Sequence, residues 1–206
     1  MKRHLGMFLA AAVCLLMAAP ARAQGGFVHA LGGVTFGTES APVFGGGGGV
    51  NLGENVQLFG EFGRMGNVIP SELQDEVDAL SELLSEDTGL PVTLEVRVPA
   101  IYGMGGLRYT VPTGGRVRPY VEAAAGFARL SVDVNADVGG IDISGLVEEE
   151  AGIEAATKFL LVLGGGIDIP VNDTLGIDVG YRWNGIFTDD PTIRASEVYG
   201  GVRITF

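Results

Sequence analysis

The feature that most constrains this fold is a two-residue alternation of apolar side chains with charged residues or glycine. In LGIDVGYRW, residues 175–183, the apolar and aromatic residues fall at odd positions, and glycine, aspartate and arginine fall at even positions. VEAAAGF at 121–127 and the last segment, 197–206, follow the same pattern. Successive side chains of a β-strand point to opposite faces, so this alternation predicts strands with one apolar face.

Eight such segments follow one another, and the connections between them differ in length. The short connections are compact turn sequences, at 53–55, 113–116 and 172–174. The other connections are two long ones, at 68–92 and 135–157, and two shorter ones, near 38–42 and 188–193. Short turns at one end and longer loops at the other are the organisation of a transmembrane β-barrel, with turns in the periplasm and loops outside. The expected strands are 26–37, 43–52, 56–67, 93–111, 117–134, 158–170, 175–187 and 194–206.

The first 23 residues have the three parts of a secretory signal peptide. Basic residues at positions 2 and 3 precede an apolar run over 5–19, and the small-residue pattern Ala-Arg-Ala follows at 21–23. The apolar run has about 15 residues, fewer than the roughly 20 that a spanning helix needs. We therefore expect cleavage after Ala23 and one mature domain over 24–206.

Net charge and hydropathy further limit the classes of protein to which this chain can belong. Removal of Lys2, Arg3 and Arg22 with the leader takes the formal net charge from −12 to −15, which argues against a nucleic-acid partner. The one cysteine, Cys14, also leaves, so no disulfide is expected. Mean hydropathy is +0.32, yet no segment after residue 23 is apolar for 18 residues in a row. The apolar side chains must therefore fill a core or face lipid from strands.

The polar face of the expected strands favours lipid over a soluble sandwich. A soluble sandwich would turn its charged face to water. Here that face mixes small residues with charges of both signs, as the narrow lumen of an eight-stranded barrel requires. We expect the charges to pair into a salt-bridged plug that leaves no wide pore. The predicted network consists of Glu61, Arg108, Arg118, Glu122, Asp168, Asp178, Arg182, Glu197 and Arg203.

Aromatic residues fall toward both ends of the expected strands. Tyr109 and Tyr120 lie close to an expected periplasmic turn, and Tyr181, Trp183 and Phe187 lie toward the opposite end. This placement fits two interfacial girdles, although aromatic residues that fill a soluble core would give a similar pattern.

The last segment, VYGGVRITF, ends on an aromatic residue with apolar or small residues two apart before it: Val198, Gly200, Val202, Ile204 and Phe206. It resembles the C-terminal signal that the outer-membrane assembly machinery reads. The strand-turn-strand YGMGGLRYTVPTGGRVRPYVEAAAGF and the whole of 24–206 resemble the small barrel superfamily of OmpA transmembrane domains, OmpX and opacity proteins. The resemblance implies an all-β, eight-stranded, antiparallel up-and-down barrel in the bacterial outer membrane, in contact with outer-membrane lipid and without a cofactor. Because nothing follows the last strand, cell-wall tethering is not implied.

The long connection after the third expected strand contains PSELQDEVDALSELLSEDTG. Ser71 and Gln74 have capping-box spacing, and Gly89 provides a stop. We expect a short extracellular amphipathic helix that caps the barrel mouth or contacts a partner or the lipid surface. Its apolar residues at helical spacing are Leu73, Val77, Leu80 and Leu84.

Chemical motifs are weak. The connection after the fifth strand is faintly like a calcium loop, but the glycine is misplaced and position twelve is Ser144 rather than glutamate, so we expect a solvated strand end and no metal. Its oxygen donors are Asp133, Asn135, Asp137 and Asp142. His29 is the one histidine after the leader and lacks a histidine–serine pair, so no enzyme is expected. The glycine run at 45–49 indicates a thin strand that allows close packing.

These observations lead to three alternative functions. The first is an integral outer-membrane barrel with a plugged lumen, which acts in envelope structure or binds an unknown surface partner through acidic outer loops. The second is a narrow porin-like channel for small solutes, which needs a gap in the charged plug. The third is a soluble periplasmic carrier resembling lipocalins, which would turn the apolar face inward.

Overall fold

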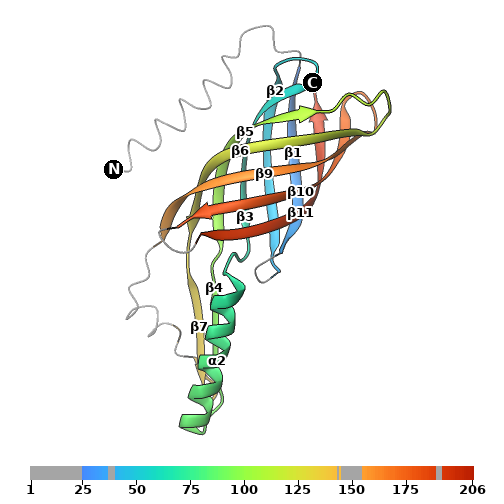
Figure 1. Ribbon diagram of the computed structural model, residues 1–206. Coiled ribbons are helices and arrows are strands. Elements are labelled where there is room, and N and C mark those ends of the chain that lie inside the picture. The colour runs from blue at the N-terminus through green and yellow to red at the C-terminus, as the bar shows by residue number, and fades with distance from the viewer. Residues whose placement is uncertain (1–24, 37–39, 143, 145–154, 189–191) are drawn as a thin grey trace.

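The eight alternating segments close into one antiparallel barrel in the computed structural model, which describes residues 25–36, 40–142, 144, 155–188 and 192–206. The order around the barrel is β1-β11-β10-β9-β6-β5-β3-β2, so each barrel strand pairs with the barrel strands before and after it in the chain (Figure 1). This confirms the predicted up-and-down barrel, whereas the predicted signal peptide lies outside the described residues. The strands are β1 (Gly26–Phe36), β2 (Pro42–Asn51), β3 (Val56–Met65), β5 (Ala100–Thr110), β6 (Arg118–Leu130), β9 (Ala156–Pro170), β10 (Leu175–Phe187) and β11 (Ile193–Thr205).

The barrel closes where the first strand meets the last. β1 and β11 pair in register from Phe27 opposite Thr205 to Phe36 opposite Ser196. Beyond this ladder, the Gly26 amide donates to the Phe206 carbonyl at 2.8 Å and the Phe206 amide donates back at 2.9 Å. Closure gives each of the eight strands two neighbours, so the barrel has no free edge.

The connections divide the barrel into a turn end and a loop end. The turn end carries the connections 52–55, 111–117 and 171–174 together with the ends of β1 and β11, near the label C in Figure 1. In one of these turns the Asn172 side-chain oxygen accepts hydrogen bonds from the Thr174 and Leu175 amides. The loop end carries the remaining four connections.

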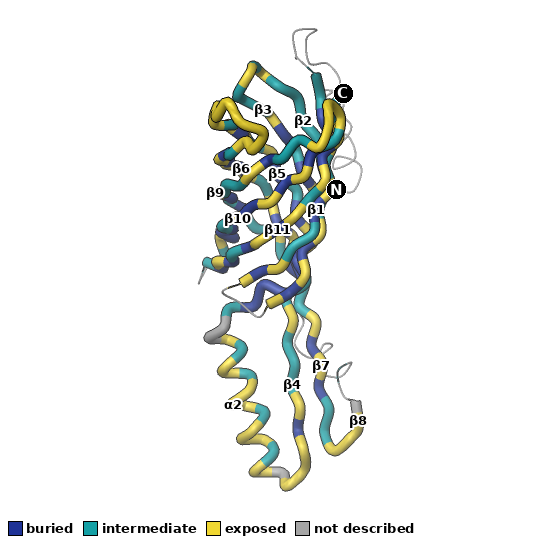
Figure 2. Tube along the Cα trace, turned by 90° about the vertical axis from the view of Figure 1, so that its right-hand side faces the viewer, coloured by how far each residue is buried: buried dark blue, intermediate teal, exposed yellow. Residues whose placement is uncertain are grey.

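A separate extension projects from the loop end, and the sequence predicted its helix but not its sheet. It consists of helix α2 (Ser71–Thr88) and a three-stranded sheet of β4 (Val92–Arg97), β7 (Asp133–Val138) and β8 (Ile141–Asp142) (Figures 1 and 2). The predicted strands 93–111 and 117–134 were each wrong as single strands. The first breaks at Val98 and Pro99, where proline has no amide to donate and the Val98 amide donates to the Asn67 side chain at 2.9 Å.

Helix α2 ends as predicted but begins differently. It stops at Gly89, which adopts the left-handed conformation at φ 67° and donates to the Ser85 carbonyl. Its N-cap is Pro70, with no side-chain cap hydrogen bond, so the predicted capping box is wrong. The helix packs along β4 and runs away from the barrel instead of lying across its mouth (Figure 2). None of the described helices is long and apolar enough to cross a membrane.

Glycines on the inner face of the barrel make room for large lumenal side chains. A Cβ added at Gly45 or Gly63 would collide with the Tyr102 hydroxyl. A Cβ added at Gly180 would likewise collide with the Tyr199 ring and with the Tyr120 hydroxyl. The glycine run of β2 therefore has the packing role expected for a thin strand.

Candidate functional site

The structure places all nine residues of the predicted charge network on the inner face of the barrel. They come from β3, β5, β6, β9, β10 and β11, and they face inward because the strands alternate in and out. Eight of the nine are buried, while the Arg118 side chain is 48% exposed at the turn end. The buried eight are Glu61, Arg108, Glu122, Asp168, Asp178, Arg182, Glu197 and Arg203.

Arg182 is the centre of this network. Its Nη1 lies 2.7 Å from Glu61 Oε1 and its Nη2 lies 2.9 Å from Glu61 Oε2, so it holds that carboxylate with both ends of the guanidinium. Its Nε donates to Glu122 Oε1 at 2.6 Å, and Glu197 Oε1 lies 3.8 Å from Nη1. The guanidinium also lies over the Tyr199 ring, 4.4 Å from the ring centre. One cation is therefore in contact with three carboxylates in a site with almost no solvent exposure.

Arg108 extends the network toward the turn end. It donates from Nε to Glu122 Oε2 at 3.0 Å and from Nη1 to Asp178 Oδ2 at 3.1 Å. Its guanidinium lies 3.9 Å from the centre of the Tyr120 ring. Asp178 in turn accepts from Arg203 Nη2 at 2.7 Å. Carboxylates and guanidiniums thus alternate along the lumen, and each charge has an opposite charge beside it.

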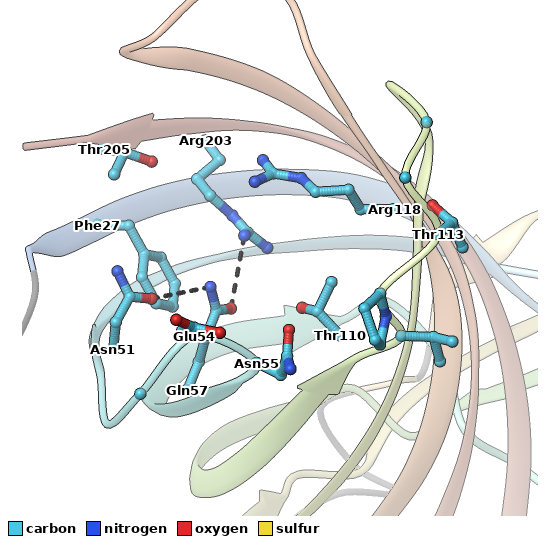
Figure 3. Close-up of a pocket in the computed structure, with 15 residues that line it drawn as sticks. Phe27, Asn51, Glu54, Asn55, Gln57, Thr110, Thr113, Arg118, Arg203 and Thr205 are labelled. Carbon is cyan, nitrogen blue, oxygen red and sulfur yellow. Dashed lines mark hydrogen bonds between the residues drawn. The ribbon is translucent and has the colours of Figure 1, made fainter.

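A polar cavity of about 320 Å³ opens at the turn end of the lumen. Figure 3 shows Arg203 and Arg118 reaching into it from one side, with Asn51, Gln57 and Thr110 on the other. Arg118 Nη2 lies 2.6 Å from Asp168 Oδ2 and Arg203 Nη1 lies 3.8 Å from the same oxygen, so one carboxylate pairs with both arginines. Water can therefore reach the first layer of the network from this end.

The loop end of the lumen has the opposite character. Aliphatic side chains from strands around the barrel meet there, and each is at most 1% exposed: Val43, Met65, Leu160, Val162 and Ile186. Val68 and Ile193 pack against the same cluster. The charged network is thus covered by an apolar layer on the side toward the extension.

Four lumenal residues were missed by the sequence reasoning. His29 Nε2 lies 3.0 Å from Glu61 Oε2, and the Tyr102 hydroxyl donates to Glu61 Oε1 at 2.9 Å. The Tyr120 and Tyr199 hydroxyls lie 2.6 Å apart. The prediction that Tyr120 belongs to an outer girdle is wrong, because it shares the inner face with Glu122 two residues later. That spacing was the signal that could have placed it.

The barrel has charged side chains inside and apolar side chains outside, which is the reverse of a water-soluble protein. Arg182 and Glu61 are fully buried, whereas Phe62 and Phe127 are 63% and 62% exposed. Tyr109, Tyr181 and other large apolar residues of the strands are exposed as well. A barrel with charges inside and apolar side chains outside is suited to a hydrocarbon solvent. The lipocalin-like alternative required the apolar face to point inward, so its carrier geometry is absent from the described strands.

Comparison with known proteins agrees with this geometry. Residues 7–206 match the family described as outer membrane protein β-barrel domain. The chain belongs to this family. It is a protein of the bacterial outer membrane. A search of curated proteins found no significant relative.

Solved structures with the same fold have little sequence in common with this barrel. Neisserial surface protein A (NspA) is 17% identical with a TM-score of 0.55, over 88% of this chain and 96% of that one. The N-terminal barrel domain of Pseudomonas aeruginosa OprF is 15% identical with a TM-score of 0.53, over 89% and 100%. A major outer membrane protein from Thermus thermophilus is 10% identical with a TM-score of 0.56, over 88% and 99%. At these identities the likeness shows the fold alone.

The weak calcium candidate does not form a loop. Asp133, Asn135 and Asp137 lie at alternate positions of the extended strand β7, and Asp142 lies opposite Asp137 on β8. Asp137 Oδ1 accepts from the Gly140 amide at 2.8 Å, as in an ordinary turn. Within the described ranges no three acidic, histidine or cysteine residues gather in the way that a metal ion needs.

The residues of the predicted assembly signal lie on β11 and at its end. Val198, Val202 and Ile204 are between 45% and 49% exposed on the outer face, and Phe206 is 76% exposed at the turn end. Their recognition by the outer-membrane assembly machinery stays a prediction.

Proposed function

We propose that this outer-membrane barrel is a non-conducting scaffold that presents its extension to a partner outside the cell. The observation that carries the proposal is the filled lumen. Guanidinium and carboxylate groups in contact occupy the middle, and an apolar layer covers them at the loop end. An ion entering from the turn-end cavity would have to break buried ion pairs and then cross apolar side chains, and both steps are costly.

The extension has the composition of a contact surface. Helix α2 contains no lysine or arginine. Exposed acids and exposed leucines are mixed along it: Asp75, Glu76, Asp78, Leu80, Glu82, Leu83, Leu84 and Glu86. A cavity of about 480 Å³ lies between the first turns of α2 and the loop end, lined largely by apolar side chains such as Leu73, Val77 and Val98. Apolar surface framed by acids favours a partner with apolar and basic groups.

We also propose that the protein is not an enzyme. His29, the one histidine after residue 23, is enclosed beside Glu61 and the Tyr102 hydroxyl is bonded to the same carboxylate. These groups bond to one another behind the network, where a substrate cannot reach them without displacing Arg182.

Conductance across a planar bilayer tests the filled lumen. The refolded protein should produce no single-channel steps above the bare bilayer. A double variant, Leu160→Ala with Ile186→Ala, removes part of the apolar layer while keeping every charge, and it serves as the matched comparison. Regular steps from the wild-type protein would overturn the plug and favour the narrow channel.

Photo-crosslinking in intact cells tests the extension. A photoreactive residue at Leu83, which is 63% exposed on α2, should yield adducts of higher mass if the extension contacts a surface partner. The same residue at Thr113 in a turn-end connection is the control. Absence of adducts at Leu83, or identical adducts at both positions, would contradict a role for the extension.

A further inference from the structure

Charge on the outer face of the barrel is confined to one level and one sign. Among the described residues of the eight barrel strands, the outward-facing charged side chains are Arg64, Arg129 and Arg194, all exposed. Each lies one residue from the loop end of its strand. The described part of the barrel strands thus carries three arginines and no acid on the surface that faces lipid, in a chain with 25 acidic and 13 basic residues.

Two of these arginines lie side by side. Arg64 on β3 is opposite Ile101 on β5, and Ile101 is opposite Arg129 on β6. Neighbouring strands are roughly 5 Å apart, so the two arginine Cα atoms are about 10 Å apart across one intervening strand. Long guanidinium side chains can converge over the Ile101 between them. Neither arginine forms an ion pair or side-chain hydrogen bond with another residue of the described chain.

A row of phenylalanines lies directly below this pair, toward the turn end. Phe62, Phe127, Phe159 and Phe187 are in one register across β3, β6, β9 and β10, and Gly103 of β5 occupies the gap in the row. The Phe62 ring lies over Gly103, and the rings of Phe127 and Phe159 meet edge to face with centres 6.2 Å apart. The row forms a continuous apolar surface on which hydrocarbon chains can lie, and the arginines mark where it ends.

This depth is where arginine can face a membrane at low cost. A charged side chain on the lipid side of a barrel is expensive at the midplane and nearly free near the interface. At the interface the available counter-charge is the lipid phosphate, which a guanidinium binds with two parallel hydrogen bonds. The loop end carries the outward connections, so the phosphates at this level belong to the outer leaflet.

From this geometry we propose that Arg64 and Arg129 bind the phosphate of an outer-leaflet lipid whose acyl chains lie on the phenylalanine row. The position also has a local electrostatic reason. The acidic extension grows from the same three strands, since α2 follows β3, β4 precedes β5 and β7 follows β6. Its negative charge would repel anionic head groups, and two arginines at its base offset that repulsion.

Arg194 provides a matched control. It lies on β11, three strands away from both β3 and β6 around the barrel, and neither neighbouring strand carries an outward-facing arginine in its described residues. It shares the exposure and the strand-end position of the other two. Loss of Arg194 therefore removes the same charge from the same level without touching the proposed site.

Native mass spectrometry of the folded protein released from micelles tests the site. The protein is titrated with phosphatidic acid, with a diphosphorylated lipid A and with phosphatidylcholine as the zwitterionic reference. The two phosphomonoester lipids should bind more tightly than phosphatidylcholine. Each of Arg64→Gln and Arg129→Gln should weaken their binding by about fivefold. Arg194→Gln should leave it unchanged, and heat-modifiable migration verifies that each variant is folded.

Three results would overturn the proposal. The first is equal affinity of the Arg64→Gln/Arg129→Gln double variant and the wild-type protein. The second is an equal loss in Arg194→Gln, which would mean that only diffuse charge matters. The third is displacement of the lipid by inorganic phosphate at the lipid's own concentration, which would identify a free-phosphate site without a contribution from the phenylalanine row.

Discussion

In the barrel every strand has a strand on each side, whereas in the extension β4 has β7 on one side and helix α2 on the other. The outer backbone groups of β4 bond to the helix through two serines one turn apart. Ser85 Oγ accepts from the Val92 amide at 2.9 Å, and Ser81 Oγ accepts from the Leu94 amide at 3.1 Å. The barrel thus has no free strand edge because it closes on itself. In the extension, the free edge of β4 is covered by the hydroxyl groups of two serines of α2.

The two regions also differ in what fills the space between their elements. The barrel encloses charged groups that are fully buried, while all four leucines of α2 are exposed. Figure 2 shows α2 as a helix of exposed and intermediate residues. The barrel should therefore be sensitive to the loss of single charges and the extension insensitive to most single substitutions. Three predictions test this contrast, and they run from the largest expected effect to the smallest.

Replacement of Arg182 by methionine should be the most damaging single change. It leaves Glu61 and Glu122 buried without their central cation, which should cost about 3–5 kcal/mol of unfolding free energy. Urea unfolding in a fixed detergent, followed by heat-modifiable migration, measures this loss. Arg194→Met removes an exposed arginine and should cost much less. Equal stability of the two variants would show that the lumenal network does not stabilise the barrel.

Alanine substitutions at two glycines, one on β10 and one on β11, test the packed interior and should have a smaller effect on the unfolding free energy. A Cβ at Gly180 would lie 2.6 Å from the Tyr199 ring, so Gly180→Ala should destabilise the barrel by about 1–3 kcal/mol. At the outward-facing Gly200 the nearest atom is 3.9 Å away, and Gly200→Ala should be nearly neutral. The same unfolding measurement distinguishes them, and an equal effect of the two alanines would argue against a tightly packed lumen.

The serine contacts of the extension should give the smallest change, and a local one. A Ser81→Ala/Ser85→Ala variant loses the two hydrogen bonds from the β4 amides, each of about 1 kcal/mol, and exposes the edge of β4. Hydrogen exchange at the Val92 and Leu94 amides should accelerate while the unfolding midpoint of the barrel stays the same. Glu82→Ala, an exposed helix position, is the control. A barrel midpoint that falls with the serines would mean that the two regions unfold together.

The sequence predicted the barrel well because alternation acts locally. Each strand's pattern determines which residues face the lumen, and all nine predicted network residues do so. The sequence could not predict which charges pair within the network, because Arg182 and Glu61 are 121 residues apart and meet only once the eight strands are in register. Which carboxylate each arginine contacts depends on the stagger between strands, and that stagger is not encoded in any one segment.

The extension shows a different limit of sequence reasoning. The alternation continues from β4 through Val98 and Pro99 into β5, so the segment looked like one long strand. Pro99 was the available signal, since proline interrupts a ladder by its missing amide. The change of sheet at that point depends on Asn67, 31 residues earlier, whose side-chain oxygen accepts from both Ile69 and Val98 amides. Long-range capping of this kind leaves no local pattern.

The pairing of β1 with β11, the seam that closes the barrel, affects the order in which the strands fold. Its ladder joins residues at opposite ends of the barrel sequence, from Phe27 with Thr205 to Phe36 with Ser196. Contacts between such distant segments form late, because the chain between them must lose conformational entropy before these contacts can stabilise it. Until β11 arrives, β1 presents an open edge to any strand nearby. The rate-limiting event of folding should therefore be closure of this seam, and substitutions along it should slow insertion more than equally destabilising substitutions between β5 and β6.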